Sequence, residues 1–294
     1  MKSGFVAIIG RPNAGKSTLL NGILDRKVAI VSERPQTTRN RISGILTLDE
    51  AQIVFLDTPG IHKPKHKMGR YMVDIAKNTL SDVDIIYYVV DASVPFGGGE
   101  NFVLERIREV KTPIFLILNK LDLLEKEDAV NLINEWKLRA EFAEIFFISA
   151  LKMENTGDLL KSTIAQLEEG PQYYPEDAVT DQPEQIVISE FIREKILKYT
   201  KEEVPHSVAV AIEKMETKKN GVTYINACIY VERNSQKKIV IGKDGIGLKR
   251  VGSEARRDIE FLLGTRVFLD LWVKVKDDWR NKDGFLTELG IKTE

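Results

Sequence analysis

The chain has 294 residues, of which 43% are apolar and 30% charged, the composition of an ordinary soluble protein with room for two domains. Lys and Arg (43) balance Asp and Glu (44), so the net charge of -1 favours no particular class of partner. The single cysteine, Cys228, excludes an internal disulfide bond and is typical of a reducing cytosol. It stands in a predicted strand, so we expect a small buried residue rather than a reactive thiol.

Apolar runs alternate with amphipathic stretches from residue 5 to about residue 169. The apolar runs predict strands over 5–9, 42–48, 52–56, 84–91, 114–119 and 144–148. The helical periodicity predicts helices over 16–25, 69–80, 100–110, 127–140 and 157–168. This alternation implies an α/β fold with a mainly parallel sheet covered on both faces. Ligands of such sheets bind beyond the carboxyl ends of the strands.

The first predicted strand leads into Gly10-Arg11-Pro12-Asn13-Ala14-Gly15-Lys16-Ser17, and a predicted helix follows. A GxxxxGKS pattern between a strand and a helix indicates a phosphate-binding loop rather than an ordinary glycine turn. Gly10 and Gly15 lack a Cβ atom, so backbone N–H groups can turn inward around an anion at the positive end of the helix dipole. We expect Lys16 to reach the β- and γ-phosphates and Ser17 to ligate Mg²⁺.

A second motif, Asp57-Thr58-Pro59-Gly60, directly follows the predicted strand 52–56. An aspartate at this strand end can hold Mg²⁺ through its water shell, and the Gly60 N–H can approach a γ-phosphate because no side chain projects from its Cα. Alone, the tetrapeptide could be a simple turn. Its place about 40 residues after a phosphate loop favours the nucleotide site.

A third motif, Asn119-Lys120-Leu121-Asp122, closes the predicted strand 114–119. The Asp122 carboxylate can accept from both N1–H and the exocyclic amine of guanine. Adenine cannot make this paired contact, so we expect strong rejection of ATP. Lys120 and Asn119 would pack over the base and tie back to the phosphate loop. After the strand 144–148, the backbone of Ser149, Ala150 and Leu151 would donate to guanine O6.

The polar segment 34–40 lies between the phosphate loop and Asp57. A threonine hydroxyl there could reach Mg²⁺ only while the γ-phosphate is present, which would make the segment a switch. Thr38 is the first choice for this ligand, and Thr37 stays open as the alternative. Ile61 occupies the position at which Ras-like switches carry a water-orienting glutamine. We therefore expect slow intrinsic hydrolysis, or dependence on another group.

Together these motifs resemble the Era-type GTPases, within the larger family of bacterial translation-associated GTPases that replace the catalytic glutamine with an apolar residue. The resemblance implies that Asn13 helps to bind K⁺ near the phosphates in place of an arginine finger. The expected metal ligands are Ser17, Thr38 and Asp57, and the expected catalytic set is Lys16, Thr38, Gly60 and Asn13. The expected nucleotide contacts are Gly10, Asn13, Ala14, Gly15, Lys16, Ser17, Thr18, Asp57, Thr58, Pro59, Gly60, Ile61, Asn119, Lys120, Leu121, Asp122, Ser149, Ala150 and Leu151.

Residues 171–185 are rich in proline, lack apolar periodicity and predict a linker. We therefore expect a GTPase domain at 1–170 and a smaller α+β domain at 186–294. The predicted elements of the smaller domain are a helix from 186 that ends near Pro205, strands at 207–212 and 224–231, a helix to about residue 263 and a strand at 267–275. The dipeptide Asn220-Gly221 is expected to form the turn between the first two strands.

The segment 237–257 contains a GxxG loop, Gly242-Lys243-Asp244-Gly245. With 20 glycines in 294 residues, chance predicts about one GxxG, so the loop alone decides nothing. Its setting is more informative, because seven basic and two acidic residues give the segment a net charge of +5. Such a loop can press its backbone against phosphates while a groove takes unstacked bases. The expected RNA contacts are Lys237, Lys238, Ile241, Gly242, Lys243, Asp244, Gly245, Lys249, Arg250, Arg256 and Arg257.

The order of elements in this domain resembles a type II KH domain. The β-branched stretch 238–241 predicts a strand by composition, whereas the resemblance implies a short helix, and we follow the resemblance. A GTPase followed by one type II KH domain is the Era arrangement. It implies binding of single-stranded RNA near the 3′ end of 16S ribosomal RNA and a role in small-subunit assembly. It also implies a cytoplasmic protein with peripheral association at the inner membrane. We expect a monomer.

The leading hypothesis is that Mg²⁺·GTP orders residues 33–40 and 60–68 and so changes how the KH surface meets RNA. A metabolic phosphotransferase could use the same phosphate loop, but it would usually prefer ATP, and Asp122 argues against that. A membrane-remodelling GTPase would need a stalk in place of the short α+β second domain. Nucleotide competition and binding to single-stranded RNA separate these hypotheses.

Overall fold

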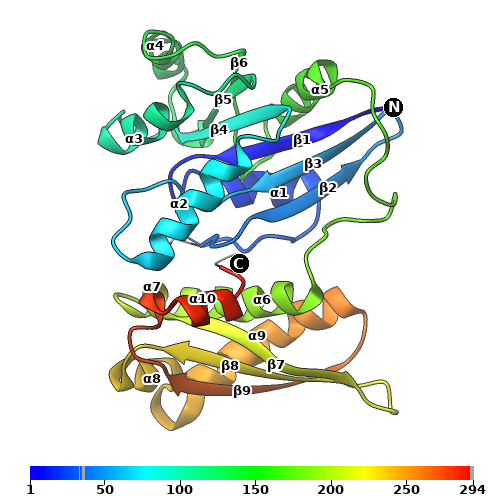
Figure 1. Ribbon diagram of the computed structural model, residues 1–294, viewed down its shortest axis with the longest axis vertical. Coiled ribbons are helices and arrows are strands. Elements are labelled where there is room, and N and C mark those ends of the chain that lie inside the picture. Colours follow the sequence, from blue (N-terminus) through cyan, green and yellow to red (C-terminus); the bar gives the residue numbers. More distant parts are fainter. Residues whose placement is uncertain (33, 35–36, 292–294) are drawn as a thin grey trace. The chain divides into compact units, whose positions relative to one another are not determined.

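The computed structural model describes residues 1–32, 34 and 37–291 (Figure 1). They form two compact units. The first comprises residues 1–29, 37–65 and 69–181, and the second comprises 182–291, 66–68 and the described part of 30–35. The predicted domain limits, 1–170, 171–185 and 186–294, stay predictions.

The first unit is an α/β domain around a six-stranded sheet. Its elements are β1 (Lys2–Ile9), α1 (Lys16–Leu24), β2 (Ile42–Thr47), β3 (Ala51–Asp57), α2 (Lys67–Thr79), β4 (Ile85–Asp91), α3 (Gly98–Ile107), β5 (Ile114–Asn119), α4 (Lys126–Lys137), β6 (Glu144–Phe147) and α5 (Thr156–Gln166). The strand order is β2-β3-β1-β4-β5-β6, and only β2 runs antiparallel to its neighbour. The predicted mainly parallel sheet is confirmed.

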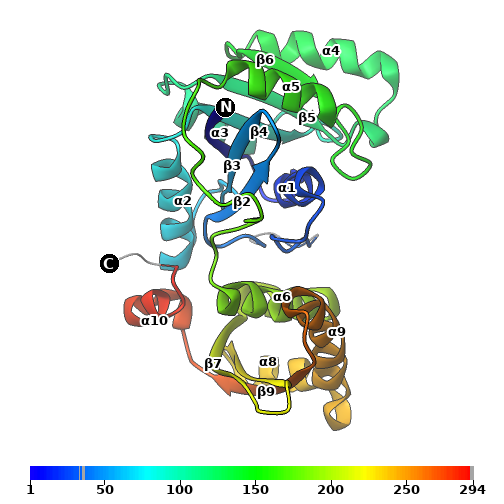
Figure 2. The ribbon, with the colours of Figure 1, turned by 90° about the vertical axis from the view of Figure 1, so that its right-hand side faces the viewer.

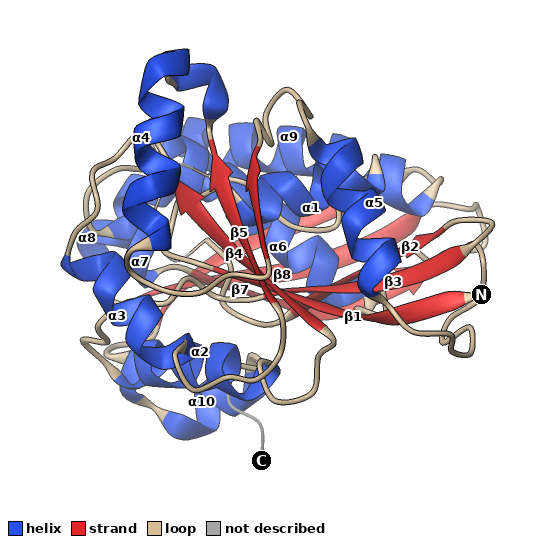
Figure 3. Ribbon diagram, turned by 90° about the horizontal axis from the view of Figure 1, so that it is seen from above, coloured by secondary structure: helices blue, strands red, loops and turns tan. Residues whose placement is uncertain are grey.

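Helices cover both faces of this sheet because successive strand residues point to opposite sides. Val6 and Ile8 of β1 pack in one buried cluster with residues of α1 and α5. Ala7 and Ile9 pack in a second cluster with residues of α2, α3 and α4. Figures 2 and 3 show α1 and α5 on one side of the strands and α2 and α3 on the other. Continuous apolar strands such as 85–90 fit this two-sided burial.

The strand register brings the three nucleotide motifs to one edge of the sheet. Ile8, near the end of β1, pairs with Asp57 at the end of β3. Asp91 at the end of β4 pairs with Asn119 at the end of β5. The phosphate loop therefore emerges beside both strand ends, as parallel strand order requires.

Part of the predicted linker packs on the first unit. The side-chain amide of Gln52 accepts from the backbone N–H groups of Tyr173 and Tyr174 and donates to the Tyr174 carbonyl. The Ile45 N–H of edge strand β2 donates to the Val179 carbonyl at 2.8 Å. These contacts pair part of an edge that would otherwise be open, which fixes the path of the chain here.

The second unit is an α+β domain with a three-stranded sheet. Its elements are α6 (Glu184–Tyr199), α7 (Val204–Ser207), β7 (Ala209–Thr217), β8 (Thr223–Val231), α8 (Asn234–Ile241), α9 (Ile246–Leu263), β9 (Val267–Val275) and α10 (Asp283–Glu288). The strand order is β7-β8-β9; β7 and β8 are antiparallel, and β8 and β9 are parallel. Cys228 is buried in β8, as expected.

Residues 238–241 are helical, so the strand suggested by β-branching is wrong and the helix implied by the KH resemblance is confirmed. The Gln236 side-chain oxygen accepts from the Glu232 and Arg233 N–H groups and so fixes the start of α8. Val240 then packs in the core of the unit while Ile239 faces solvent. Packing and capping together override the local β propensity.

None of the helices formed by residues 1–32, 34 and 37–291 is long and apolar enough to cross a membrane.

Candidate nucleotide and RNA sites

The phosphate loop has the backbone that its glycines allow. Gly15 has a φ of 96° and Asn13 a φ of 66°, both left-handed. A Cβ atom on Gly15 would lie 2.2 Å from the Asn119 side-chain nitrogen, and one on Gly10 would lie 2.1 Å from the Val89 carbonyl oxygen. Close approach of neighbouring strand ends therefore requires glycine at both positions.

Lys16 is buried, with only 6% of its surface exposed. Its ammonium donates to the Arg11 carbonyl at 3.0 Å and to the Gly10 carbonyl at 3.3 Å. Burial lowers its pKa, and the nearby carboxylates of Asp57 and Glu100 oppose that shift. A buried cation at the start of α1 is arranged to attract phosphate oxygens, because an anion would relieve the cost of its desolvation.

The three predicted metal ligands lie together. The Ser17 hydroxyl donates to Asp57 Oδ2 at 2.7 Å and lies 3.0 Å from Thr38 Oγ1, which donates to the same carboxylate oxygen at 3.3 Å. Thr38 is 5% exposed. Residues 33, 35 and 36 of the predicted switch lie outside the described residues, and so do the properties predicted for them.

This cluster fits Mg²⁺. Burial raises the pKa of Asp57, while Lys16 and the hydrogen bonds from Ser17 and Thr38 oppose the shift. Among the described residues, Asp57 Oδ1 is a buried oxygen without a hydrogen-bond partner. An unpaired buried carboxylate oxygen is costly unless a cation or water satisfies it. Hydroxyl and carboxylate oxygens are also the ligands that Mg²⁺ prefers.

The segment after Asp57 is tied to the phosphate loop through its backbone. The Ile61 N–H donates to the Gly10 carbonyl at 3.1 Å, and both the N–H and the hydroxyl of Thr58 donate to the Ile8 carbonyl. A Cβ atom on Gly60 would lie 2.7 Å from the Pro12 nitrogen. The Ile61 side chain packs in the core with α2 and α3. Its position near the site is therefore a backbone contact only.

The base-recognition motif is held by Asn119, which links three parts of the site. Its Nδ2 donates to the Ala14 carbonyl at 2.8 Å, and its Oδ1 accepts from the Ala150 N–H at 2.9 Å. The Ser149 hydroxyl donates to Asp122 Oδ1 at 2.6 Å, which orients the predicted guanine-reading carboxylate. Half-buried Asp122 keeps its second oxygen toward the site opening in a setting where a lost contact would be costly.

Two acidic residues that contact the site were not predicted. Asp91 forms an ion pair with Lys120. Glu100 is 5% exposed, accepts a hydrogen bond from Tyr88 and lies 3.5 Å from the Arg11 guanidinium of the phosphate loop. Asp91 ends a strand at the same sheet edge, a signal that the sequence contains. Glu100 begins α3 after three glycines, and only the fold shows that this turn meets Arg11.

Asn119→Ala is expected to lower the free energy of unfolding of the nucleotide-free protein by about 2–4 kcal/mol. The change leaves the buried Ala14 carbonyl and Ala150 N–H without their partner. Urea unfolding measures the effect. Asn101→Ala, on the exposed face of α3, is the control and should change stability by less than about 0.5 kcal/mol. Equal effects of the two substitutions would contradict the bridging role of Asn119.

In the second unit, the GxxG loop joins α8 to α9. Gly242, Asp244 and Gly245 all have left-handed φ values, of 73°, 53° and 77°. A Cβ atom on Gly242 would lie 2.8 Å from the Gly247 nitrogen, whereas the space around Gly245 is open. The loop thus turns tightly and leaves its backbone accessible on one side, a surface that suits a phosphate backbone.

A groove of about 540 Å³ lies beside this loop, between α9 and edge strand β9. Its lining includes Gly245, Lys249 and Arg256, which were predicted RNA contacts. It also includes Leu248, Leu269 and Leu271, apolar residues that were not predicted. Lys238, Lys243, Lys249, Arg250, Arg256 and Arg257 are exposed, and Lys237, Ile241, Gly242 and Gly245 are half-buried. A basic rim around an apolar groove beside an open strand edge suits single-stranded RNA.

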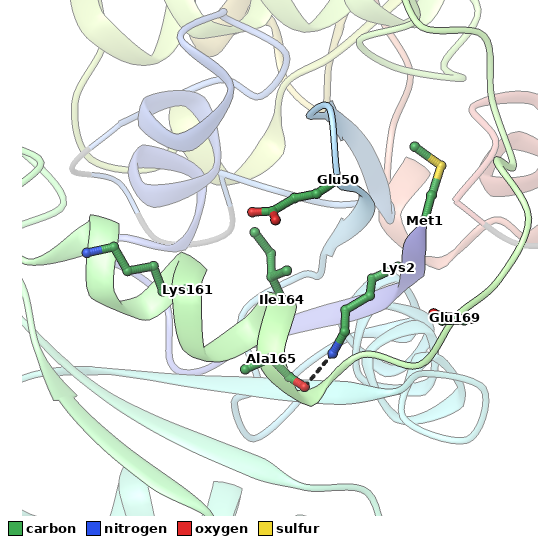
Figure 4. A pocket seen from close by; sticks show the side chains of 7 residues that line it. All are labelled: Met1, Lys2, Glu50, Lys161, Ile164, Ala165 and Glu169. Atoms are coloured by element: carbon green, nitrogen blue, oxygen red, sulfur yellow. Dashed lines mark hydrogen bonds between the residues drawn. The ribbon is translucent and has the colours of Figure 1, made fainter.

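A second hollow, of about 380 Å³, lies at the amino end of β1 (Figure 4). Its lining includes Lys2, whose ammonium donates to the Ala165 carbonyl, and the carboxylates of Glu50 and Glu169. It is at the opposite end of β1 from the phosphate loop, so it is no part of the nucleotide site.

Comparison with known proteins gives the same two-domain assignment. A family described as 50S ribosome-binding GTPase matches residues 5–120, and the KH domain family matches residues 203–280. A crystal structure of Era in complex with MgGDPNP and nucleotides 1506–1542 of 16S ribosomal RNA is 40% identical, with a TM-score of 0.97 and full coverage of both chains.

A crystal structure of an Era variant from Aquifex aeolicus bound to GDP·AlF₄⁻ is also 40% identical over the full length of both chains, with a TM-score of 0.96. Identity at this level over the entire length assigns the family. The GTPase fold and the C-terminal KH domain are both confirmed. The chain therefore belongs to the Era family of GTPases.

Proposed function

We propose that this GTPase is a switch that binds single-stranded 16S ribosomal RNA near its 3′ end and assists assembly of the small ribosomal subunit. The observation that carries the proposal is the contact of Thr38 with Ser17 and Asp57. It places a residue of the predicted switch on the metal-binding cluster. The RNA is inferred from the Era complex with nucleotides 1506–1542 and from the basic groove of the KH domain.

In this proposal Ser17, Thr38 and Asp57 would hold Mg²⁺ with the nucleotide. The ion would neutralise developing charge on the phosphates. Lys16 binds the β- and γ-phosphates, and the Gly60 N–H donates to the γ-phosphate. Asp122 reads guanine, with its carboxylate oriented by Ser149. Because the Ile61 side chain is buried in the core, it cannot orient the attacking water, and slow intrinsic hydrolysis follows.

The switch is tested by RNA affinity with a non-hydrolysable GTP analogue and with GDP. We expect a ratio of about 5 to 150 in the wild type, the range of typical coupling between two sites. Thr38→Ala should reduce the ratio to about one, because the loop loses its ligand to the metal cluster. Thr37→Ala is the matched control and should keep the wild-type ratio.

Equal RNA affinities of the wild type with both nucleotides would contradict the coupling. Loss of the ratio in Thr37→Ala, with Thr38→Ala unaffected, would instead assign the metal ligand to Thr37.

Asn13 is proposed to help bind K⁺ near the phosphates. Its left-handed backbone exposes the side chain at the mouth of the loop. GTP hydrolysis should rise about tenfold or more when K⁺ replaces Na⁺, a fraction of what an arginine finger supplies. Asn13→Ala should remove that difference while it leaves the rate in Na⁺ unchanged. A rate that does not depend on the cation in the wild type would overturn this role.

The remaining parts of the proposal rest on the Era resemblance: action on the small subunit in the cytoplasm, peripheral association with the inner membrane and a monomeric state. A metabolic phosphotransferase is the second candidate that the phosphate loop allows. Preference for ATP over GTP in competition would favour it, and the Ser149–Asp122 pair argues against it.

A further inference from the structure

The KH sheet carries aromatic side chains on the face opposite its helices. Ile225, Ala227 and Ile229 of β8, and alternate residues of β9, pack in the core with α6 and α9. Figures 1 and 2 show these two helices on one face of the sheet. Because strand residues alternate, Tyr224, Phe268 and Trp272 point to the other face. We call this set of three rings the outer aromatic face.

Two of these rings are exposed to a degree that their size makes costly. Phe268 exposes 60% of its surface and Trp272 exposes 58%. Tyr224 stacks on Phe268 with ring centroids 5.8 Å apart and planes inclined by 15°. Exposed, nearly parallel aromatic rings on neighbouring strands are unusual on a surface without a ligand.

A single carboxylate organises this face. Asp270 Oδ2 accepts from the Tyr224 hydroxyl, the Asn226 amide and the Trp272 indole, each at 3.1 Å. Three donors on one oxygen fix the two polar rings and offset the negative charge of the carboxylate. The rings are therefore held in place before any ligand arrives, which reduces the entropy cost of binding.

The end of the face at Tyr224 is rimmed by cations. Lys218 lies over the Tyr224 ring at 5.1 Å, and Lys219 and Arg266 are exposed nearby in the β7–β8 turn and at the start of β9. In the part of the chain that the structure describes, no carboxylate lies within 4.0 Å of these three cations. Farther along the face, Lys274 is paired with Glu213. Unpaired cations beside stacked rings suit a polyanion that carries planar bases.

This face is continuous with the groove of the GxxG loop. Phe268 belongs to the outer aromatic face and also lines the groove, together with Gly245 and Arg256. Strand β9 is the edge of the sheet, so a chain that leaves the groove can pass around this edge at Phe268.

We propose that the outer aromatic face is a second RNA subsite, on which unpaired bases that extend beyond the GxxG groove stack on Phe268 and Trp272. The inference rests on the proposed RNA-binding function, since it assigns a further part of the same strand. A KH groove holds about four nucleotides, so a longer single strand requires additional surface. Aromatic rings supply it without strict sequence preference.

The test compares a short RNA of about four nucleotides, which fills the groove alone, with a long one of about ten. Both derive from the single-stranded 3′ end of 16S ribosomal RNA. Phe268→Ala and Trp272→Ala should each weaken the long RNA by about 5- to 100-fold and leave the short RNA within about twofold, apart from a small effect of Phe268 on the groove. Lys274→Ala, on the same strand and face, is the matched control and should leave both unchanged.

Tryptophan fluorescence gives a readout without loss of a ring. The chain has 3 Trp, and Trp136 and Trp279 are buried, so Trp272 is the exposed one. The long RNA should quench the emission of the wild type, the short RNA should not, and Trp272→Phe should lose the quenching while it keeps affinity.

Equal affinity of Phe268→Ala, Trp272→Ala and wild type for the long RNA would overturn the second subsite. The proposed function is judged separately by Lys243→Asp, which reverses an exposed charge in the GxxG loop and should weaken both RNAs. If the wild type binds neither RNA, the proposed function fails, and the second subsite fails with it.

Discussion

Asp122→Asn is expected to lower the affinity for GTP by about 10³-fold or more and to create affinity for xanthosine triphosphate. The Asp122 carboxylate can accept from N1–H and the exocyclic amine of guanine together, whereas an asparagine presents an N–H₂ group to that amine. Xanthine carries a carbonyl oxygen at C2. The amide of Asn at position 122 can donate to this oxygen while its own oxygen accepts from N1–H. Competition binding with the three nucleotides GTP, XTP and ATP measures the change.

The local fold should tolerate this substitution. An amide has nearly the shape of the carboxylate, and its oxygen can still accept from the Ser149 hydroxyl. Asp158→Asn, at an exposed ion pair of α5, is the control and should leave nucleotide preference unchanged. Retention of wild-type GTP affinity by Asp122→Asn would show that this carboxylate does not read the base.

The sequence predicts the framework of the site because each motif follows a strand, and parallel strands end at one edge. Asp57, Asn119 and the phosphate loop needed no tertiary information beyond that rule. The choice between Thr37 and Thr38 was different, because adjacent residues of a loop carry no periodicity. The structure brings the Thr38 hydroxyl to Ser17 and Asp57. Whether Thr38 is the ligand stays a prediction for the RNA-affinity ratio to decide.

Residues outside the motifs were harder to predict because their roles depend on packing. Glu100 contacts the phosphate loop only because the preceding glycines allow a close approach; a Cβ atom on Gly99 would lie 2.5 Å from the Arg11 guanidinium. Burial raises the pKa of Glu100, and the Tyr88 hydrogen bond and Arg11 oppose the shift. Likewise, the outer aromatic face joins rings from β8 and β9, which are about 40 residues apart in the chain. Pairing register, which no local pattern contains, brings them together.

Lys16→Met is expected to reduce GTP hydrolysis by about 10²- to 10³-fold and to weaken GTP binding, without loss of folding. An ammonium has three N–H donors, and in Lys16 the Arg11 and Gly10 carbonyls accept from two of them. These contacts hold the chain across the loop and leave a donor for a phosphate oxygen. Methionine keeps the length of the apolar stem but cannot neutralise charge. Single-turnover hydrolysis and nucleotide titration measure the two effects.

Stability separates this role from a structural one. Because burial lowers the pKa of Lys16, its charge is costly in the nucleotide-free protein, and its removal relieves that cost. The substitution also removes a cation that opposes the raised pKa of Asp57, so that carboxyl would hold its proton more readily. We therefore expect the free energy of unfolding without nucleotide to fall by no more than about 1 kcal/mol. Lys77→Met, on the exposed side of α2, is the control and should leave hydrolysis unchanged. Loss of stability in Lys16→Met that parallels the loss of hydrolysis would assign Lys16 to the fold rather than to the phosphates.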